Sequence, residues 1–232
     1  MAERIIPQHI SIIMDGNGRW AKARGQQRAY GHIEGVERVR DITTACVELG
    51  VRYLSLYTFS EENWNRPAEE VNALMGLMMK SIEGEYETMM RNGVRFRVLG
   101  NRERLSYLLL EAITNLENAT SGNTNMDMII MLSYSGKWDI LQAARKLIES
   151  GRTAEQLDYA DIDAALVTAG IPDPELVIRT SGEKRISNYM LWQTAYSEFV
   201  FTDTLWPDFR KEQLLDAIDE YSSRDRRFGK VK

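Results

Sequence analysis

Two hydrophobic patterns alternate along this chain. Short runs of mostly apolar residues are separated by longer segments in which apolar positions recur every third or fourth residue. The short runs are typical of buried strands, and the longer periodic segments are typical of amphipathic helices. Strands are therefore predicted at His9–Met14, Tyr53–Phe59, Arg95–Leu99, Met126–Leu132, Leu176–Ile178 and Glu198–Phe201. Helices are predicted at Ile33–Leu49, Ala68–Arg91, Arg104–Ala119, Trp138–Ser150, Ile162–Ala169 and Lys211–Tyr221.

This alternation predicts the fold class. Strands that alternate with helices form a mostly parallel sheet covered by helices, which is an α/β fold, here with about six strands. No internal repeat or Pro/Gly/Ser-rich linker interrupts the sequence, so residues 1–232 are predicted to form a single domain. Two helix ends have local support, because Gly50 follows Leu49 as a C-cap glycine does and Pro67 suits a first helical turn.

Composition and charge narrow the class of partner. Hydrophobic residues make up 44% of the chain, which is enough for a sizeable core, and the net charge is −5. A chain without a basic excess is not expected to bind nucleic acid. Basic residues nevertheless cluster near both ends, between Asp15 and Glu34 and from Arg224 to Lys232. Such clusters suit an anionic ligand, although solvated faces are the more frequent explanation of charge alone.

Cysteine content and the absence of long apolar runs help to predict the cellular compartment of the protein. A single cysteine, Cys46, excludes an intramolecular disulfide and a multi-cysteine zinc site, and its apolar helical context predicts a core position. The segment Met1–Pro7 lacks the apolar run of a signal peptide, and no stretch approaches the length of a membrane span. We therefore expect a cytoplasmic protein.

The candidate site lies in the loops that follow the predicted strands, because ligands of open α/β sheets bind beyond the carboxyl ends of the strands. The first such loop is Asp15-Gly16-Asn17-Gly18-Arg19-Trp20. Its glycines allow backbone N–H groups to approach a phosphate, Arg19 can bind phosphate oxygens as a fork, and Asp15 can hold a magnesium ion on a diphosphate. The same run is also good turn chemistry for a hairpin. Beyond it, His32 can donate to a phosphate or can be a capping or partly buried histidine.

Two further loops carry polar side chains. After the second strand, Trp64 is either a loop anchor packed on the core or an apolar wall beside a polar site. After the fifth strand, Arg179, Arg185 and Ser187 surround a glycine turn and form a second candidate phosphate cradle. Glu198, at the start of the last strand, is either a second metal ligand or a salt-bridge partner for one of those two arginines.

Four blocks of the sequence, taken together, are similar to those of a known family. They are His9–Ala21, Phe59–Pro67, Ile178–Asn188 and Trp206–Phe209. In this order they closely resemble the signature blocks of undecaprenyl diphosphate synthases, which are cis-prenyltransferases. The resemblance runs from His9 to Gly229, and the first block is highly specific to the family.

The resemblance implies an activity and its cofactor. Enzymes of this family add isopentenyl diphosphate units to an allylic diphosphate and use Mg²⁺. Farnesyl diphosphate is the implied starter, and undecaprenyl diphosphate for cell-wall lipid carrier synthesis is the implied product. A shorter- or longer-chain cis-polyprenyl diphosphate synthase is the alternative. A non-catalytic subunit of a heteromeric prenyltransferase is disfavoured, because Asp15, Arg19, Asn63 and Glu198 are all present.

The resemblance also implies a role for each matching residue. Asp15 is similar to the family's magnesium-binding aspartate, Asn63 to its proposed proton acceptor, and Glu198 to its second metal ligand. The allylic diphosphate cradle is matched by Gly16, Asn17, Gly18, Arg19, Trp20, Arg28 and His32. The loop that closes over the substrates is matched by Ser60, Glu61, Glu62, Trp64 and Arg66. The isopentenyl diphosphate site is matched by Arg179, Arg185, Ile186 and Ser187.

The assembly implied by the resemblance is a homodimer. Arg227 and Gly229 are similar to a tail element that reaches the active site of the neighbouring subunit. Because the product is strongly apolar, we expect its release to be slow and to involve transient contact with a membrane surface. The protein is therefore expected in the cytoplasm and at the periphery of the inner face of the membrane.

Three positions depart from the family's usual pattern. Ser181 replaces a common glycine, and Lys184 occupies a position of variable identity. The run Ser133-Tyr134-Ser135-Gly136-Lys137 replaces the usual Asn-Tyr-Gly-Gly-Arg. This loop is therefore expected to differ locally from the usual geometry. None of these changes removes a charged ligand, so activity is expected to be retained.

A growing hydrocarbon chain needs a dry tunnel, and one apolar stripe can supply its wall. At helical spacing lie Val71, Leu74, Met75, Met78 and Ile82, and a strand that can face them carries Met126, Met128 and Met131. Methionine adapts to irregular apolar shapes, which suits such a wall. Most of these residues are expected to be core, and periodicity does not separate core from tunnel. We predict a tunnel role for at least one of Met78 and Met131.

Overall fold

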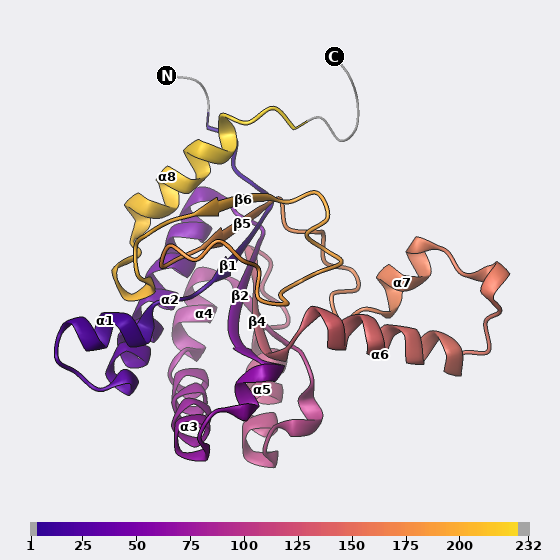
Figure 1. Ribbon diagram of the computed structural model, residues 1–232, viewed down its shortest axis with the longest axis horizontal. Coiled ribbons are helices and arrows are strands. Elements are labelled where there is room, and N and C mark those ends of the chain that lie inside the picture. The colour runs from indigo at the N-terminus through magenta and orange to yellow at the C-terminus, as the bar shows by residue number, and fades with distance from the viewer. Residues whose placement is uncertain (1–3, 227–232) are drawn as a thin grey trace.

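Six parallel strands form one sheet in the computed structural model, which describes residues 4–226 (Figure 1). The strands are β1 (His9–Ile13), β2 (Tyr53–Ser60), β3 (Val94–Leu99), β4 (Met126–Tyr134), β5 (Leu176–Arg179) and β6 (Glu198–Phe201). Their spatial order is β3-β4-β2-β1-β5-β6, and every neighbouring pair is parallel. All six predicted strands and the α/β fold class are confirmed.

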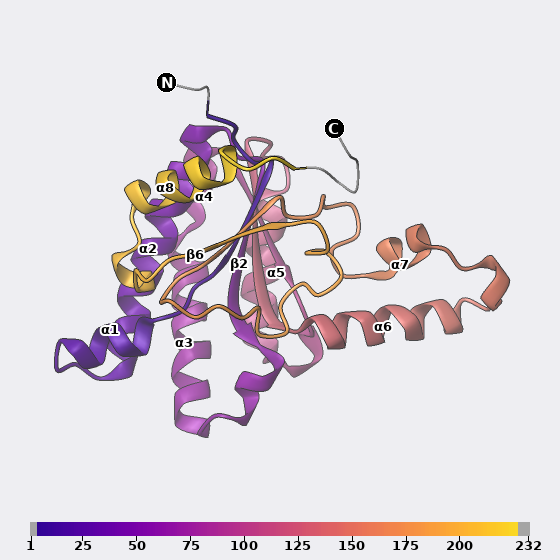
Figure 2. The same ribbon diagram turned by 45° about the horizontal axis from the view of Figure 1, so that its top comes forward.

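Helices surround the sheet, and two of them project from it. The described helices are α1 (Asn17–Ala23), α2 (Arg28–Leu49), α3 (Ala68–Gly84), α4 (Tyr86–Asn92), α5 (Tyr107–Thr120), α6 (Gly136–Glu149), α7 (Tyr159–Ala165) and α8 (Lys211–Ser222). Buried residues of α2, α5 and α8 pack with one face of the sheet in the main core. Helices α6 and α7 pack on each other and extend away from the sheet as an arm, as both views show (Figures 1 and 2).

Three helix predictions need correction. The predicted helix Ala68–Arg91 is two helices, α3 and α4, with Glu85 between them. Gly84 ends α3, and glycine is among the poorest helix formers, while the Glu85 carboxylate is bound by Arg40 of α2. Helix α1 was not predicted, since its seven residues include Gly18 and carry too short a pattern. The helix predicted at Ile162–Ala169 begins three residues earlier, at Tyr159.

The start of α2 and the loop before α1 position the site. Residues Asp15 to Gly18 lead into α1 rather than into a hairpin, because β1 pairs in parallel with β2 and β5. Gly16 has φ of 110°, and a Cβ there would lie 2.9 Å from the Leu205 side chain. Glycine is therefore needed at this turn for both conformation and space.

The main core confirms the interpretation of the single cysteine. Cys46 is fully buried in this core, and burial raises the pKa of its thiol to about 12. A protonated, buried thiol is unreactive packing material. Across residues 4–226, no helix is long and apolar enough to cross a membrane.

Candidate active site

A cavity of about 490 Å³ lies at the carboxyl ends of β1, β2 and β5. The strand register creates it, because Ile13 of β1 lies beside Tyr57 of β2 and Arg179 of β5, and the three following loops converge. Its lining includes the predicted site residues Asp15, Gly16, Asn17, Gly18, Arg19, Arg28, His32, Ser60, Asn63, Arg66, Arg179, Arg185 and Ser187. The lining does not include Trp20, Glu61, Glu62, Trp64, Ile186 or Glu198.

An ion pair between Asp15 and Arg179 joins the first loop to the third. Arg179 Nη2 donates to Asp15 Oδ2 at 2.8 Å, and Arg179 Nη1 donates to Ser187 Oγ at 2.8 Å. Burial by itself would raise the pKa of the Asp15 carboxyl, but the hydrogen bond and charge of Arg179, with the charge of Arg19, hold that pKa below its usual value. Asp15 is therefore an anion at neutral pH.

Arg19 lies on the other side of Asp15. Its Nη2 is 3.7 Å from Asp15 Oδ1, and its Nη1 donates to the Ser181 carbonyl oxygen at 3.0 Å. Arg19 also donates to the Ser181 hydroxyl. Ser181 has φ of 80°, a left-handed conformation that serine rarely adopts and that the glycine usual at this position would adopt freely. The departure at Ser181 thus keeps the backbone turn and adds a hydroxyl that holds Arg19.

Close packing of α1 on α2 depends on two glycines that sequence reasoning did not single out. A Cβ at Gly31 would lie 2.0 Å from the Asn17 carbonyl oxygen, and one at Gly35 would lie 2.6 Å from Asn17 Oδ1. Asn17 Oδ1 is buried and has no hydrogen-bond partner. Trp206 Nε1 donates to the Gly35 carbonyl oxygen at 2.9 Å. The four-residue spacing of the two glycines was the available signal.

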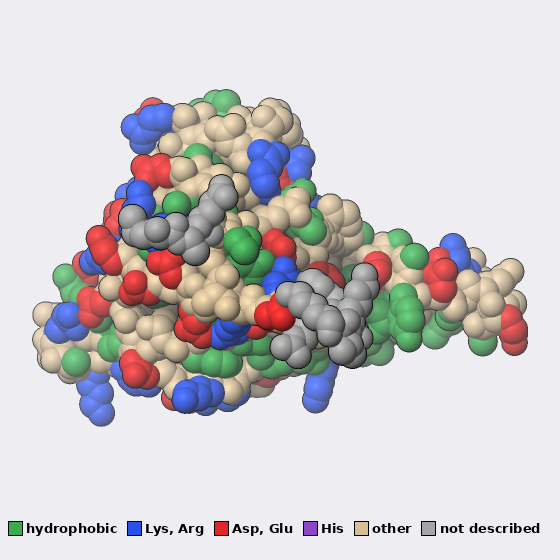
Figure 3. Space-filling view, turned by 90° about the horizontal axis from the view of Figure 1, so that it is seen from above, with side chains coloured by type: hydrophobic (Ala, Val, Ile, Leu, Met, Phe, Trp, Pro, Cys, Tyr) green, Lys and Arg blue, Asp and Glu red, His purple; other side chains and the backbone are tan. Residues whose placement is uncertain are grey.

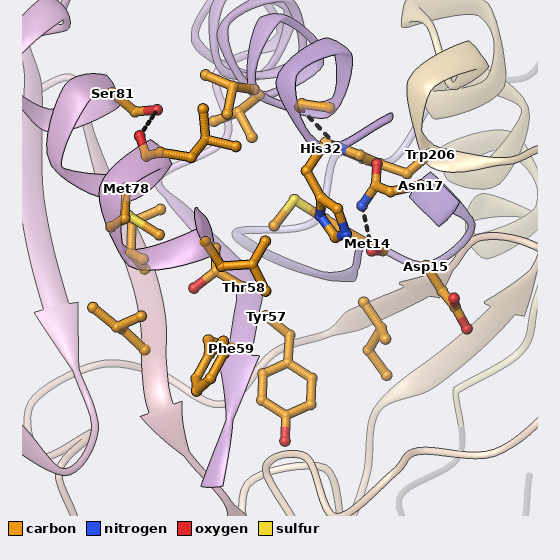
Figure 4. A pocket seen from close by; sticks show the side chains of 18 of the residues that line it. Met14, Asp15, Asn17, His32, Tyr57, Thr58, Phe59, Met78, Ser81 and Trp206 are labelled. Atoms are coloured by element: carbon orange, nitrogen blue, oxygen red, sulfur yellow. Dashed lines mark hydrogen bonds between the residues drawn. The ribbon is translucent and has the colours of Figure 1, made fainter. Parts of the chain in front are cut away.

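A second group of polar residues lies at the start of α2. His32 Nε2 is buried without a hydrogen-bond partner, and burial, followed by the charges of Arg66 and Arg28, lowers the pKa of His32 to about 4. The imidazole is therefore neutral at pH 7. Arg28 and Arg66 both approach Glu70 Oε1, at 3.4 and 3.1 Å. Figure 4 places Asp15, Asn17 and His32 on one side of the cavity, opposite Met78 and Ser81 of α3.

The second loop forms a 3₁₀ helix, Glu61–Asn65, after β2. The Ser60 amide donates to Asn63 Oδ1 at 3.0 Å, which closes a capping box. Trp64 packs edge-on against Phe59, with 5.0 Å between ring centroids, and against the main core, and it is not part of the cavity lining. The loop-anchor interpretation of Trp64 is therefore the one the structure supports.

Trp20 and Glu198 also lie away from the cavity. Trp20 is buried, and its Nε1 donates to Asp208 Oδ1 at 2.7 Å. Glu198 forms a salt bridge with Arg224 at 2.7 Å, whereas the salt bridge expected from the sequence was to Arg179 or Arg185. The register places Glu198 level with Ile10, three residues or about 10 Å before the carboxyl end of β1, whereas Asp15 follows that end. One chain therefore does not bring Asp15 and Glu198 together.

Predictions for the tail cannot be placed on this structure. Arg227 and Gly229 lie outside the described residues 4–226. Within that range, Ile186 is half-buried between Arg185 and Ser187, which both line the cavity. The residues predicted to bind isopentenyl diphosphate thus lie together after β5, with Arg179 buried at the base of the loop.

The apolar end of the cavity lies between α3 and one face of β4. Its walls include Leu74, Met75, Met78 and Ile82 from α3 and Met128, Ile130 and Leu132 from β4. Met131 points to the opposite face of the sheet, where it packs with Tyr57 and Tyr134. Strand residues alternate between faces, so Met128 and Met131 cannot share one. Of the two residues named for a tunnel role, Met78 lines the cavity, whereas Met131 does not.

Asp15 is a suitable ligand for a magnesium ion. Mg²⁺ takes oxygen ligands and is commonly held by one or two carboxylates together with substrate phosphates. The Asp15 carboxylate is ionised, about one-third exposed and surrounded by cavity. Among residues 4–226 there is no group of three or more His, Cys, Asp or Glu side chains that could hold a metal.

Comparison with known sequences identifies close relatives over nearly the whole chain. Residues 13–229 match a family model described as putative undecaprenyl diphosphate synthase. An isoprenyl transferase of Porphyromonas gingivalis is 49% identical, over 98% of this chain and 91% of its own length. One from Aquifex aeolicus is 46% identical, over 97% of each chain.

Solved structures of diphosphate synthases are also similar to this chain over nearly its whole length. A lavandulyl diphosphate synthase from Lavandula x intermedia, in complex with dimethylallyl diphosphate, superposes with a TM-score of 0.93 at 35% identity, covering 97% of this chain and 98% of that one. A probable undecaprenyl diphosphate synthase from Campylobacter jejuni gives a TM-score of 0.83 at 30% identity, covering 97% and 100%.

Proposed function

This chain belongs to the undecaprenyl diphosphate synthase family and is a prenyltransferase, and we propose that it adds isopentenyl diphosphate units to an allylic diphosphate. One observation carries the proposal. A single cavity is lined by Asp15, Arg19 and Arg28 at one end and by apolar side chains of α3 and β4 along the rest. A diphosphate head joined to a hydrocarbon tail has the complementary chemistry.

The allylic diphosphate binds, in this proposal, between α1 and the start of α2. Arg19 and Arg28 donate to its phosphate oxygens, and the Gly18 backbone can approach closely because it carries no side chain. The buried Nε2 of His32 has no partner in the protein and is available to a phosphate oxygen. A phosphate bound beside the neutral His32 imidazole would raise the pKa of His32, so substrate binding is expected to take up a proton.

Asp15 is the residue proposed to hold magnesium on the diphosphate. When bound, the ion acts as a Lewis acid that stabilises the departing pyrophosphate. Arg179 keeps the Asp15 carboxylate ionised and fixes its position through the 2.8 Å hydrogen bond. Because Glu198 lies about 10 Å before the carboxyl end of β1 and Asp15 lies beyond that end, we propose that Glu198 serves a metal only across a subunit boundary.

The isopentenyl diphosphate is assigned to the loop after β5. Arg185 is exposed and can turn toward a phosphate, and Ser187 Oγ lines the cavity. Arg179 is mostly buried and contacts both Asp15 and Ser187, so it links the two diphosphate positions. The isopentenyl double bond then attacks the allylic carbon as the carbon–oxygen bond to pyrophosphate breaks.

A proton must then leave the former isopentenyl fragment. Asn63 is the acceptor that the family resemblance suggests, but its Oδ1 already accepts from the Ser60 amide at 3.0 Å and an amide is a weak base. The departing pyrophosphate is the stronger base in the same cavity. We therefore assign Asn63 the role of orienting the acceptor.

The product length has two candidates that differ in how far the cavity opens. A long-chain product such as undecaprenyl diphosphate requires the far end, near the Arg40–Glu85 ion pair, to open. A shorter-chain cis-prenyl diphosphate synthase, whose product does not require this opening, is the second candidate.

The proposed assembly is a homodimer formed through the arm. Leu141, Ala144 and Ile148 lie at i, i+3 and i+7 on α6 and are all exposed, as is Tyr159 of α7. Figure 3 shows hydrophobic side chains gathered along this arm. An exposed apolar stripe of this kind marks an interaction surface. We propose a second copy as its partner, and transient membrane-surface contact during release of the apolar product by a cytoplasmic enzyme.

One assay tests the function. Purified protein is incubated with radiolabelled isopentenyl diphosphate, farnesyl diphosphate and Mg²⁺, and product length is resolved by thin-layer chromatography. We expect apolar labelled product that disappears when EDTA replaces the metal. Absence of any labelled product with farnesyl, geranyl and dimethylallyl starters would overturn the proposal, and the length of the product decides between the two candidates.

A further inference from the structure

The turn from the end of β4 into α6, Ser133–Lys137, is where this chain departs most from the family's usual pattern, and it begins with a residue in an unusual conformation. Ser133 is fully buried and has φ of 51°. Left-handed conformations disfavour residues other than glycine, asparagine and aspartate. The groups that the buried Ser133 hydroxyl binds therefore matter, because these contacts can stabilise the unfavourable backbone conformation.

The Ser133 hydroxyl binds two residues of the 3₁₀ helix Glu61–Asn65. It accepts from Trp64 Nε1 at 2.8 Å and donates to the Glu61 carboxylate. Arg104 reaches the same two side chains, at 3.3 Å from Glu61 Oε2 and with its guanidinium 4.7 Å from the centre of the Trp64 ring. The second loop is therefore fastened to the end of β4 on the side that faces away from the cavity.

The same turn also holds the third loop. The Gly136 amide donates to the Asn188 carbonyl oxygen at 2.6 Å, and the Lys137 amide donates to Asn188 Oδ1 at 3.0 Å. Asn188 Nδ2 in turn donates to Glu62 Oε1 at 2.6 Å. Two of the three loops that carry proposed substrate-binding residues are thus attached to one short turn.

We propose that Ser133 is a positioning residue that fastens the Ser60–Arg66 loop in its closed place, so that Asn63 and Arg66 face the cavity. The inference rests on the proposed function, because it assigns the loop to substrate binding. Removal of the hydroxyl leaves the Glu61 carboxylate and the Trp64 N–H without this partner. The loop then opens more often, and substrate must supply the free energy that closes it.

The test is Ser133→Gly, which separates the hydroxyl from the backbone. Glycine adopts the left-handed conformation without steric cost, so a purely structural role for Ser133 predicts an unchanged or higher melting temperature and unchanged kinetics. Our proposal predicts the same melting temperature, together with amide hydrogen exchange at residues 60–66 that is about tenfold faster. It also predicts an apparent KM for the allylic diphosphate that rises about tenfold.

Two companion variants keep the result interpretable. Ser135→Gly makes the same change two residues away, at a buried serine whose hydroxyl accepts from the Trp138 amide, and it should leave loop exchange and KM unchanged. Ser133→Asn should restore both, because asparagine tolerates the left-handed conformation and carries a donor and an acceptor.

The outcomes separate the inference from the function. Exchange at residues 60–66 in Ser133→Gly equal to wild type overturns the fastening role, and faster exchange without a change in KM overturns its part in substrate binding. Loop exchange is measured without substrate. A wild-type protein that incorporates no isopentenyl diphosphate therefore refutes the proposed function without affecting the exchange result.

Discussion

Arg179 carries a charge that is almost entirely removed from water, with 4% of its side chain exposed. Its guanidinium is shared between Asp15 on one loop and Ser187 on another. A buried cation is tolerated only when it is paired and hydrogen-bonded, so the loop after β5 and the loop after β1 constrain each other. The sequence alone identified the arginines and carboxylates of the site as candidate phosphate or metal ligands. It did not predict which of them form ion pairs, because the strand order determines which loops lie next to each other.

Asp15 therefore has two roles that different substitutions separate. Asp15→Asn keeps the shape and an acceptor for Arg179 but removes the charge, so we expect the fold to persist and turnover to fall about a hundredfold or more. Asp15→Ala leaves the buried Arg179 unpaired and is expected to lower the free energy of unfolding by as much as about 3 kcal/mol. Urea unfolding and isopentenyl incorporation, measured on both variants, check this. If Asp15→Asn keeps more than about a tenth of the wild-type turnover, Asp15 does not hold a metal ion that the reaction needs.

The buried histidine of β1 makes stability depend on pH. His9 Nδ1 donates to the Pro172 carbonyl oxygen at 2.6 Å, its Nε2 lies 2.7 Å from Ser55 Oγ, and burial lowers its pKa to about 4. The unfolded chain binds the proton near pH 6.5 and the folded chain only near pH 4, so stability falls as the pH drops through this window. The shift corresponds to about 3 kcal/mol for His9.

His32 acts in the same direction, since its pKa is also lowered to about 4. Urea unfolding at pH 7 and pH 5 should therefore show lower stability at the lower pH, and His9→Gln should remove about half of the part that the two histidines contribute. A His9→Gln variant with the full pH dependence of wild type would show that His9 is not responsible.

Element-scale geometry decides which apolar residues can meet a substrate. Strand β4 is buried along its whole length, so its burial pattern does not show which side chains lie on which face of the sheet. Alternation nevertheless places Met128, Ile130 and Leu132 toward α3, and Met131 toward the Tyr57 and Tyr134 side. Met78 of the α3 stripe lines the cavity. The sequence interpretation grouped the methionines of β4 by composition and did not take into account that Met128 and Met131 face opposite sides of the sheet.

These two faces yield a matched pair of variants. Met78→Trp adds bulk inside the cavity, so we expect shorter products at a nearly unchanged rate of the first condensation, which takes place at the strand ends. Met131→Trp adds the same bulk on the opposite face and should lower the free energy of unfolding by about 1–3 kcal/mol without changing product length. Product distribution and melting temperature are measured on both. Shortened products from Met131→Trp alone would refute the assignment of the faces.

The whole molecule shows how far sequence patterns reach. Apolar runs and helical stripes predicted the six strands and the parallel sheet, because burial dictates both patterns locally. The arm was not predicted: the apolar positions of α6 follow the same periodicity as core residues, and only the structure shows that Leu141 and Ile148 lie 51% and 76% exposed. Likewise, Gly31 and Gly35 matter through contacts with Asn17, which is distant in sequence.

The exposed stripe of the arm leads to a prediction about assembly. Water contact with Leu141 and Ile148 is unfavourable, and two copies that cover each other's arms remove it. Leu141→Asp with Ile148→Asp would place two charges in that proposed interface, where they would be desolvated without partners. Analytical ultracentrifugation is therefore expected to show a dimer for the wild type and a monomer for this variant. The fold should persist, because neither side chain belongs to a core cluster.

Leu108→Asp is the matched control, since Leu108 of α5 is 66% exposed but lies on the body of the protein rather than on the arm. It should sediment as wild type does. If the arm variant remains a dimer, the interface lies elsewhere, and if Leu108→Asp alone gives monomers, the interface includes α5. Because the tail residues Arg227 and Gly229 are predicted to reach a neighbouring subunit, a monomeric arm variant should also lose isopentenyl incorporation while retaining the melting behaviour of a folded chain.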